Sequence, residues 1–135
     1  MHFAVVARSV ILFVPLLLSC DKSPEPSPSS CNCQMDAWRV SVPSFITYQV
    51  DSHADASVFA ISYQTAEGKV TVAPDSLPFK LTTALDKGDT IMLAAVGTPK
   101  NGSIILGYEI TEKNTLNPAS VTASRVWVTK NGSCQ

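Results

Sequence analysis

The feature that most constrains the fold is an alternation of apolar and polar residues with a period of two, which recurs from Cys31 to Cys134. Such a period places successive side chains on opposite faces of a β-strand, whereas an amphipathic helix repeats every 3.6 residues. The alternating segments are 38–42, 46–50, 59–63, 69–72, 79–81, 91–95, 104–110 and 121–129. Turn residues such as Gly, Pro, Asn and Asp separate them. The region is therefore predicted to consist of short strands.

Short strands at intervals of roughly eight to twelve residues, without a helical stripe, are typical of an all-β domain. We expect an immunoglobulin-like antiparallel β-sandwich of seven to eight strands, spanning residues 33–135. In this sandwich Trp38 and Trp127 would be core residues. The alternative is that either tryptophan is exposed and binds a partner.

Residues 1–19 have the features of a bacterial lipoprotein signal peptide. Arg8 precedes the apolar run 10–18, which is too short to span a bilayer, and the sequence at 17–20 is Leu-Leu-Ser-Cys. This ending resembles the lipobox, in which the cysteine thiol receives diacylglycerol and the chain is cut before it. We therefore expect removal of residues 1–19 and lipidation of Cys20. An ordinary secretory signal with a coincidental cysteine is the alternative.

Residues 20–32 are predicted to form a tether between the lipid and the domain. The segment 21–30 contains three prolines and four serines, a composition that favours extended, polyproline-like geometry. At ~3.1 Å per residue the segment reaches roughly 30 Å. We therefore expect the domain on the periplasmic or outer face of the bacterial cell envelope, anchored to either the inner or the outer membrane.

Three cysteines, Cys31, Cys33 and Cys134, follow the lipidation site. Outside the inner membrane cysteines tend to be oxidised, so a disulfide is expected. A bond between Cys31 and Cys33 would be strained, which leaves Cys134 as the partner of one of them. We favour Cys33, because it lies nearer the first expected strand, while pairing through Cys31 stays open. Alternatively, the order Cys31-x-Cys33-x-Met35 offers soft ligands that suit Cu(I).

The sequence contains no motif that indicates catalysis, and we expect neither enzyme activity nor a cofactor. Asp51 and Asp55 flank His53. A nucleophilic triad requires a serine, a histidine and an acid brought together, and a catalytic metal site usually has three protein ligands. We interpret 51–55 as a polar turn. The formal net charge of the chain is −1, whereas nucleic-acid-binding proteins usually have an excess of basic residues. Nucleic acid is therefore not an expected partner.

Several motifs in the strand region resemble the MmpS-type domain family. They are Ile46-Thr47-Tyr48-Gln49-Val50, Ile61-Ser62-Tyr63, Ala66-Glu67-Gly68, Leu77-Pro78-Phe79, Lys87-Gly88-Asp89 and Leu93-Ala94-Ala95, within residues 45–110. The resemblance implies a small envelope protein with an immunoglobulin-like sandwich held at a membrane. The best-known members of that family assist resistance–nodulation–division exporters of lipids or siderophores.

Together these features predict a non-catalytic envelope lipoprotein. We expect a monomer that is attached to the membrane through the lipid on Cys20 and that acts as an accessory or binding module for another envelope protein, such as an exporter. The alternative is an envelope carrier or sensor that binds a small ligand or a metal.

Overall fold

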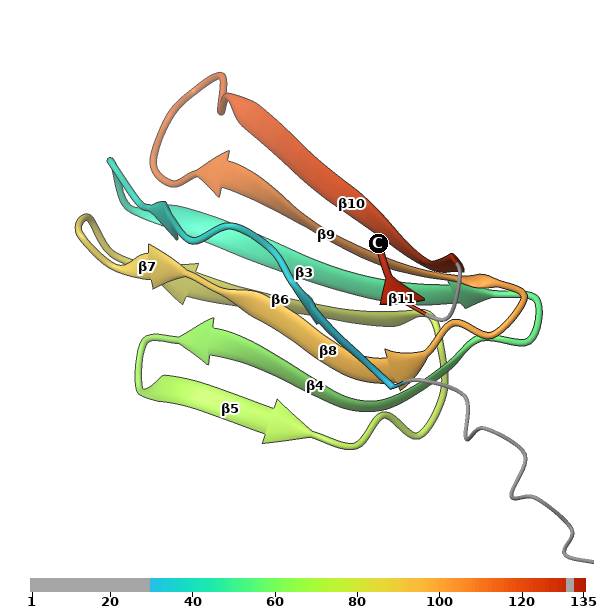
Figure 1. Ribbon diagram of the computed structural model, residues 1–135. Helices are drawn as coiled ribbons and strands as arrows, with labels where there is room; N and C mark the ends of the chain where they lie inside the picture. Colours follow the sequence, from blue (N-terminus) through green and yellow to red (C-terminus); the bar gives the residue numbers. More distant parts are fainter. Residues whose placement is uncertain (1–29, 131–132) are drawn as a thin grey trace, which may run out of the picture.

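Eleven β-strands make up the part of the chain that the computed structural model describes, residues 30–130 and 133–135 (Figure 1). The strands are β1 (Cys31–Gln34), β2 (Trp38–Arg39), β3 (Ser44–His53), β4 (Ser57–Thr65), β5 (Gly68–Val72), β6 (Phe79–Leu85), β7 (Thr90–Ile91), β8 (Leu93–Thr98), β9 (Ser103–Glu112), β10 (Ser120–Lys130) and β11 (Ser133–Cys134). β2, β7 and β11 contain two residues each, which leaves eight longer strands. The predicted all-β sandwich is confirmed.

The longer strands form two antiparallel layers. One sheet has the order β1-β8-β4-β5 and the other β11-β10-β9-β3-β6, while β2 pairs with β7 in a small separate sheet. The neighbours β3 and β6 in one layer, and β4 and β8 in the other, correspond to strands B, E, C and F of an immunoglobulin sandwich. The outer positions differ, because β9 crosses to lie beside β3 and β1 lies beside β8.

The alternation in the sequence accounts for the face that each sheet buries. The five-stranded sheet contributes Ile46, Tyr48 and Val50 of β3 and Ile104, Leu106 and Tyr108 of β9 to the core. The four-stranded sheet contributes Cys33, Ile61, Tyr63, Leu93 and Ala95. Side chains between these positions point away from the core, as expected for a strand whose successive side chains alternate in direction.

Tyr48 connects the two sheets at the centre of the core. Its hydroxyl donates a hydrogen bond to the Gln64 carbonyl on β4 at 2.9 Å, and its ring centroid lies 5.7 Å from that of Tyr63. The Tyr63 ring in turn lies 5.8 Å from Phe79. Burial raises the pKa of Tyr48 to about 12, so the phenol stays protonated and keeps its donor role at neutral pH.

The two tryptophans occupy different environments. Trp127 is 6% exposed and belongs to the core, whereas Trp38 is 58% exposed, so the prediction that Trp38 is a core residue is wrong. The strand expected over 38–42 ends at Arg39, and Val40 is held to the β7 side by a 2.8 Å hydrogen bond from its N–H to the Asp89 carbonyl. Val40 is buried in the core, whereas Trp38, two residues before it, lies outside.

The first strand begins at Cys31, inside the range 20–32 that the sequence assigns to the tether. The predicted signal peptide 1–19 and the lipidation site Cys20 lie outside the described residues. The rest of the predicted tether up to residue 29 also lies outside them.

Candidate functional site

A disulfide between Cys31 of β1 and Cys134 of β11 connects the two sheets. The Cα atoms lie 5.6 Å apart, within the usual range for a disulfide. The expected disulfide to Cys134 is present. The prediction that Cys33 is its partner is wrong, because the bond is to Cys31. Both Cys31 and Cys33 face the interior. Cys31 pairs with Gly97 at the end of the sandwich where β11 lies, whereas Cys33 pairs with Ala95 further in.

Cys33 is a buried free thiol. Burial raises its pKa to about 11, so the thiolate needed for metal binding or nucleophilic attack is scarce at neutral pH. The soft-ligand hypothesis joined Cys31, Cys33 and Met35, and the disulfide removes Cys31 from that set. Within residues 30–130 and 133–135, no group of three or more His, Cys, Asp or Glu side chains is placed to hold a metal ion.

His53 is exposed at the end of β3, in the tight turn that leads to β4. The Ser52 N–H donates to Asp51 Oδ1 at 2.8 Å, and the Ala56 N–H donates to the His53 carbonyl at 3.3 Å. Ala54 adopts the left-handed conformation with φ 53° that such a turn requires. These contacts are those of a turn, in agreement with the polar-turn interpretation.

An apolar groove of about 130 Å³ lies at the end of the sandwich opposite the disulfide. Its apolar lining consists of Trp38, Val40, Val42, Ile110, Ala119 and Val121, and we call it the Trp38 groove. Trp38 and Val121 are each 58% exposed and Val42 is 39% exposed. Ser44 and Glu112 add polar atoms to its lining. The groove therefore offers an apolar surface with a large aromatic side chain at its margin.

The Trp38 groove exists because the four-stranded sheet does not cover the start of β10. The inward-facing positions of β10 include Val121, Arg125 and Trp127, but of these three only Trp127 is buried. The segment that follows β1 approaches this uncovered surface and leaves a channel between them. The sequence did not reveal the groove, because alternating apolar residues over 38–42 indicate a strand that faces the core. Pro43 marks the end of that run after residue 42 and gives no sign that the strand ends at Arg39.

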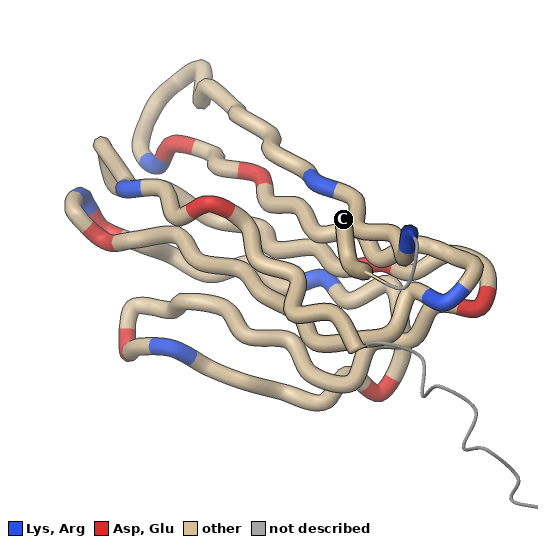
Figure 2. The backbone as a smooth tube through the Cα atoms, in the orientation of Figure 1, with Lys and Arg blue, Asp and Glu red and all other residues tan. Residues whose placement is uncertain are grey.

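Charged residues are sparse along the long strands and gather near their ends (Figure 2). Two cations lie over aromatic rings. The Lys113 Nζ is 5.1 Å from the Phe45 centroid near the Trp38 groove, and the Arg125 guanidinium carbon is 5.2 Å from the Trp127 centroid on β10. Aromatic faces attract cations at such distances. The apolar groove thus has charges of both signs beside it, Lys113 on the aromatic ring and the lining carboxylate Glu112.

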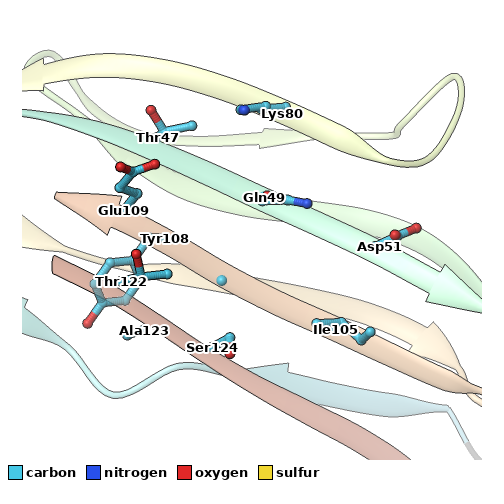
Figure 3. Close-up of a pocket in the computed structure, with 11 residues that line it drawn as sticks. Thr47, Gln49, Asp51, Lys80, Ile105, Tyr108, Glu109, Thr122, Ala123 and Ser124 are labelled. Atoms are coloured by element: carbon cyan, nitrogen blue, oxygen red, sulfur yellow. The ribbon is translucent and has the colours of Figure 1, made fainter. Parts of the chain in front are cut away.

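A second hollow of about 230 Å³ lies on the outer face of the five-stranded sheet; many of its lining residues have polar side chains, although most of its surface is apolar. It is centred on Gly107 of β9, which has no side chain and pairs with Gln49 of β3 and Ser124 of β10. Figure 3 shows polar side chains around this gap on neighbouring strands; the polar lining also includes Thr47, Asp51, Lys80, Glu109 and Thr122. Their hydroxyl, amide and charged groups could hydrogen-bond a small polar molecule.

No family model, curated protein or solved structure matches the chain. The resemblance to the MmpS-type family is therefore still a prediction. The part of the chain that the structure describes has no helix long and apolar enough to cross a bilayer.

Proposed function

We propose that this protein is a non-catalytic envelope lipoprotein whose sandwich domain binds another envelope protein through the Trp38 groove. The observation that carries the proposal is the exposure of Trp38 beside Val42 and Val121. Monomeric proteins rarely expose large contiguous apolar patches without a function, and tryptophan is among the residues that contribute most to protein–protein binding. In this proposal the domain itself is a monomer and Trp38 enters a pocket on the partner.

The disulfide supports an envelope location. Bonds such as Cys31–Cys134 persist in oxidising compartments and are rare in the cytosol. Lipidation of Cys20 would hold the domain near the membrane. The exporters suggested by the MmpS-type resemblance are then the first partners to examine, because an accessory protein must reach the extracytoplasmic part of such a complex.

The anchor is tested by replacing Cys20 with alanine. The variant should remain an uncleaved or soluble precursor, because no thiol is available to receive diacylglycerol. Cell fractionation measures where the variant is located, and its intact mass shows whether the signal peptide has been removed and a lipid added. A Cys20→Ala protein that matures and stays with the membrane like the wild type would rule out the lipoprotein assignment.

Partner binding is tested by comparing Trp38→Ser with Phe59→Ser. Phe59 on β4 is 54% exposed, so it matches Trp38 in exposure while lying on the four-stranded sheet and outside the lining of the Trp38 groove. Cross-linking in intact cells followed by mass spectrometry should identify an envelope protein with the wild type and with Phe59→Ser. Recovery should fall about tenfold or more with Trp38→Ser, the effect of removing a central aromatic contact. Equal recovery with both variants would refute the groove as the binding site.

A second candidate function, carriage of a small polar ligand, is favoured by the hollow above Gly107. Gln49 and Ser124 flank this gap on adjacent strands, and both can donate and accept hydrogen bonds. Native mass spectrometry of the protein purified from its own envelope should then detect a bound small molecule. If the small molecule is bound to the wild type and not to Gln49→Ala, this function is supported. If no small molecule is found on the wild-type protein, it is rejected.

A further inference from the structure

The outer edge of β10 is the longest open edge of the sandwich within residues 30–130 and 133–135. β9 pairs with the inner edge of β10 continuously from Ser120 to Val128. On the other edge, β11 pairs only with Thr129 and Lys130. Most of the outer edge of β10 is therefore without a neighbouring strand in the described part of the chain.

The backbone groups along this edge are directed toward a missing strand. Val128 exchanges two hydrogen bonds with Gln135, at 2.8 and 3.0 Å, so its N–H and C=O point to the outer side. In an antiparallel ladder, residues alternate between those that bond one neighbouring strand and those that bond the other. The N–H and C=O groups of Thr122, Ser124 and Val126 therefore point to the same outer side, and all three residues are exposed.

The other sheet edges carry features that discourage pairing. β1 has four residues, β5 has five and includes Lys69, and β6 includes Lys80 and follows Pro78. Short strands, lysine and proline are the usual means by which proteins protect an edge. Between Ser120 and Val126, β10 has neither lysine nor proline and only one charged residue, Arg125, and Val126 is 51% exposed.

The charge of β10 indicates which kind of strand it accepts. Figure 2 shows blue and no red along β10, because its charged residues are Arg125 and Lys130. A second copy of β10 would bring further basic residues and no carboxylate to pair with Arg125. A segment with an acidic side chain at that position complements the edge.

We propose that the open edge of β10 binds an extended segment of another envelope protein by strand addition, and that this segment carries apolar side chains and a carboxylate that faces Arg125. β11 already pairs antiparallel with the far end of the same edge, and the added strand would continue its line. Inward-facing side chains of the added strand would lie beside Val121, next to the Trp38 groove. The inference rests on the proposed function and names the chemistry of its partner.

The probe is a synthetic seven-residue peptide, Thr-Glu-Thr-Val-Thr-Val-Thr, with a fluorophore at one end. Paired antiparallel with β10, it places its glutamate opposite Arg125 and a valine opposite Val121. Binding to the full-length protein in detergent is followed by fluorescence anisotropy. Replacing the glutamate by lysine should weaken binding roughly threefold to tenfold, as for an exposed ion pair that becomes a repulsion. Methylating the threonine amides should abolish binding, because those N–H groups face β10.

Two protein variants separate strand addition from contact with side chains. Ser124→Pro removes an N–H that faces the open edge and leaves pairing with β9 intact, so binding should weaken at least about tenfold. Ser124→Ala keeps that N–H and should bind like the wild type. Arg125→Glu should reverse the preference, so that the lysine peptide binds better than the glutamate peptide. Circular dichroism confirms that each variant retains its β-structure.

Three outcomes overturn the inference. They are an absence of peptide binding, equal binding to Ser124→Pro, and a dimer in sedimentation analysis that Ser124→Pro dissociates, which would make a second copy the occupant. The proposed function has its own readout. If the peptide fails to bind while Trp38→Ser still abolishes cross-linking in cells, the partner-binding role stands and β10 is not the docking edge. If the peptide binds and Trp38→Ser leaves cross-linking in cells unchanged, the open edge of β10 is supported as a binding site and the Trp38 groove is refuted.

Discussion

Trp127 and Val121 lie on the same face of β10, yet 6% of Trp127 and 58% of Val121 is exposed. Trp127 lies toward the end where the Cys31–Cys134 disulfide joins the sheets, which we call the closed end. Val121 lies at the Trp38 groove, which we call the open end. The position of a residue along a strand determines which face of the sheet its side chain lies on. Whether that side chain is buried depends on whether the opposing sheet covers it.

Breaking the disulfide should have the largest effect on this comparison. Cys134→Ala removes a cross-link with a sequence separation of 103, and such a loop is worth up to about 5 kcal/mol in the chain-entropy model. We expect a lower melting temperature in thermal unfolding. Cys33→Ala is the matched control, because it keeps the bond; non-reducing peptide mapping should still find Cys31 linked to Cys134. Loss of the link in Cys33→Ala would contradict the observed pairing.

Truncating the two tryptophans should separate the ends directly. Trp127→Ala opens a cavity at the closed end and should lower the free energy of unfolding by about 3–5 kcal/mol. Trp38→Ala removes a side chain that is 58% exposed and should cost less, on the order of 1 kcal/mol. Urea unfolding monitored by circular dichroism measures both. Comparable losses in the two variants would mean that the open end is covered in solution.

High pH should weaken the core that connects the two ends. Burial raises the pKa of Cys33 from 9.0 to about 11 and that of Tyr48 from 10.0 to about 12. Ionisation above pH 9 is easier in the unfolded chain than in the folded one, so stability is full below that pH and falls as pH rises through these values. Each group should contribute a loss on the order of 2 kcal/mol.

Two variants measure how much Cys33 and Tyr48 each contribute to the loss of stability at high pH. The slope of unfolding free energy against pH should become shallower between pH 9 and 11 in Cys33→Ala, and between pH 10 and 12 in Tyr48→Phe. Urea unfolding at several pH values measures these slopes. Unchanged slopes in both variants would show that other groups govern alkaline stability.

The smallest expected effects concern the two cation–aromatic contacts. Arg125→Ala removes the contact with buried Trp127, and Lys113→Ala removes the contact with half-exposed Phe45. Each should cost about 0.5–1 kcal/mol, with the larger loss for Arg125 because its aromatic partner is more shielded from water. Urea unfolding measures both changes, and a larger loss for Lys113→Ala would contradict this ranking.

Local pattern accounts for much of the fold. The alternation at 46–50 and 104–110 predicts strands β3 and β9 and their buried faces, but not that these two strands pair. The compartment suggested by the leader predicts a disulfide to Cys134. Each of these inferences depends on neighbours in sequence or on general chemistry.

Features that depend on the opposing layer were not predictable in this way. Cys31 and Cys33 share one face of β1, and only the position of β11 distinguishes them. Trp38 and Val40 belong to one apolar alternation, yet Val40 is buried and Trp38 is exposed. The Trp38 groove likewise arises where two segments distant in sequence meet. The pattern along a single strand does not indicate which distant segments pack against each other.

The position of the disulfide also determines how the domain would respond to a pulling force. Cys31 is the first residue of β1 and Cys134 the last of β11, and Figure 1 shows both strands near one end of the sandwich. Tension applied between residue 30 and Gln135 would pass through the sulfur–sulfur bond and largely bypass the residues between the two cysteines. The domain can therefore bear a load along its terminal segments while its sheets remain mechanically unloaded.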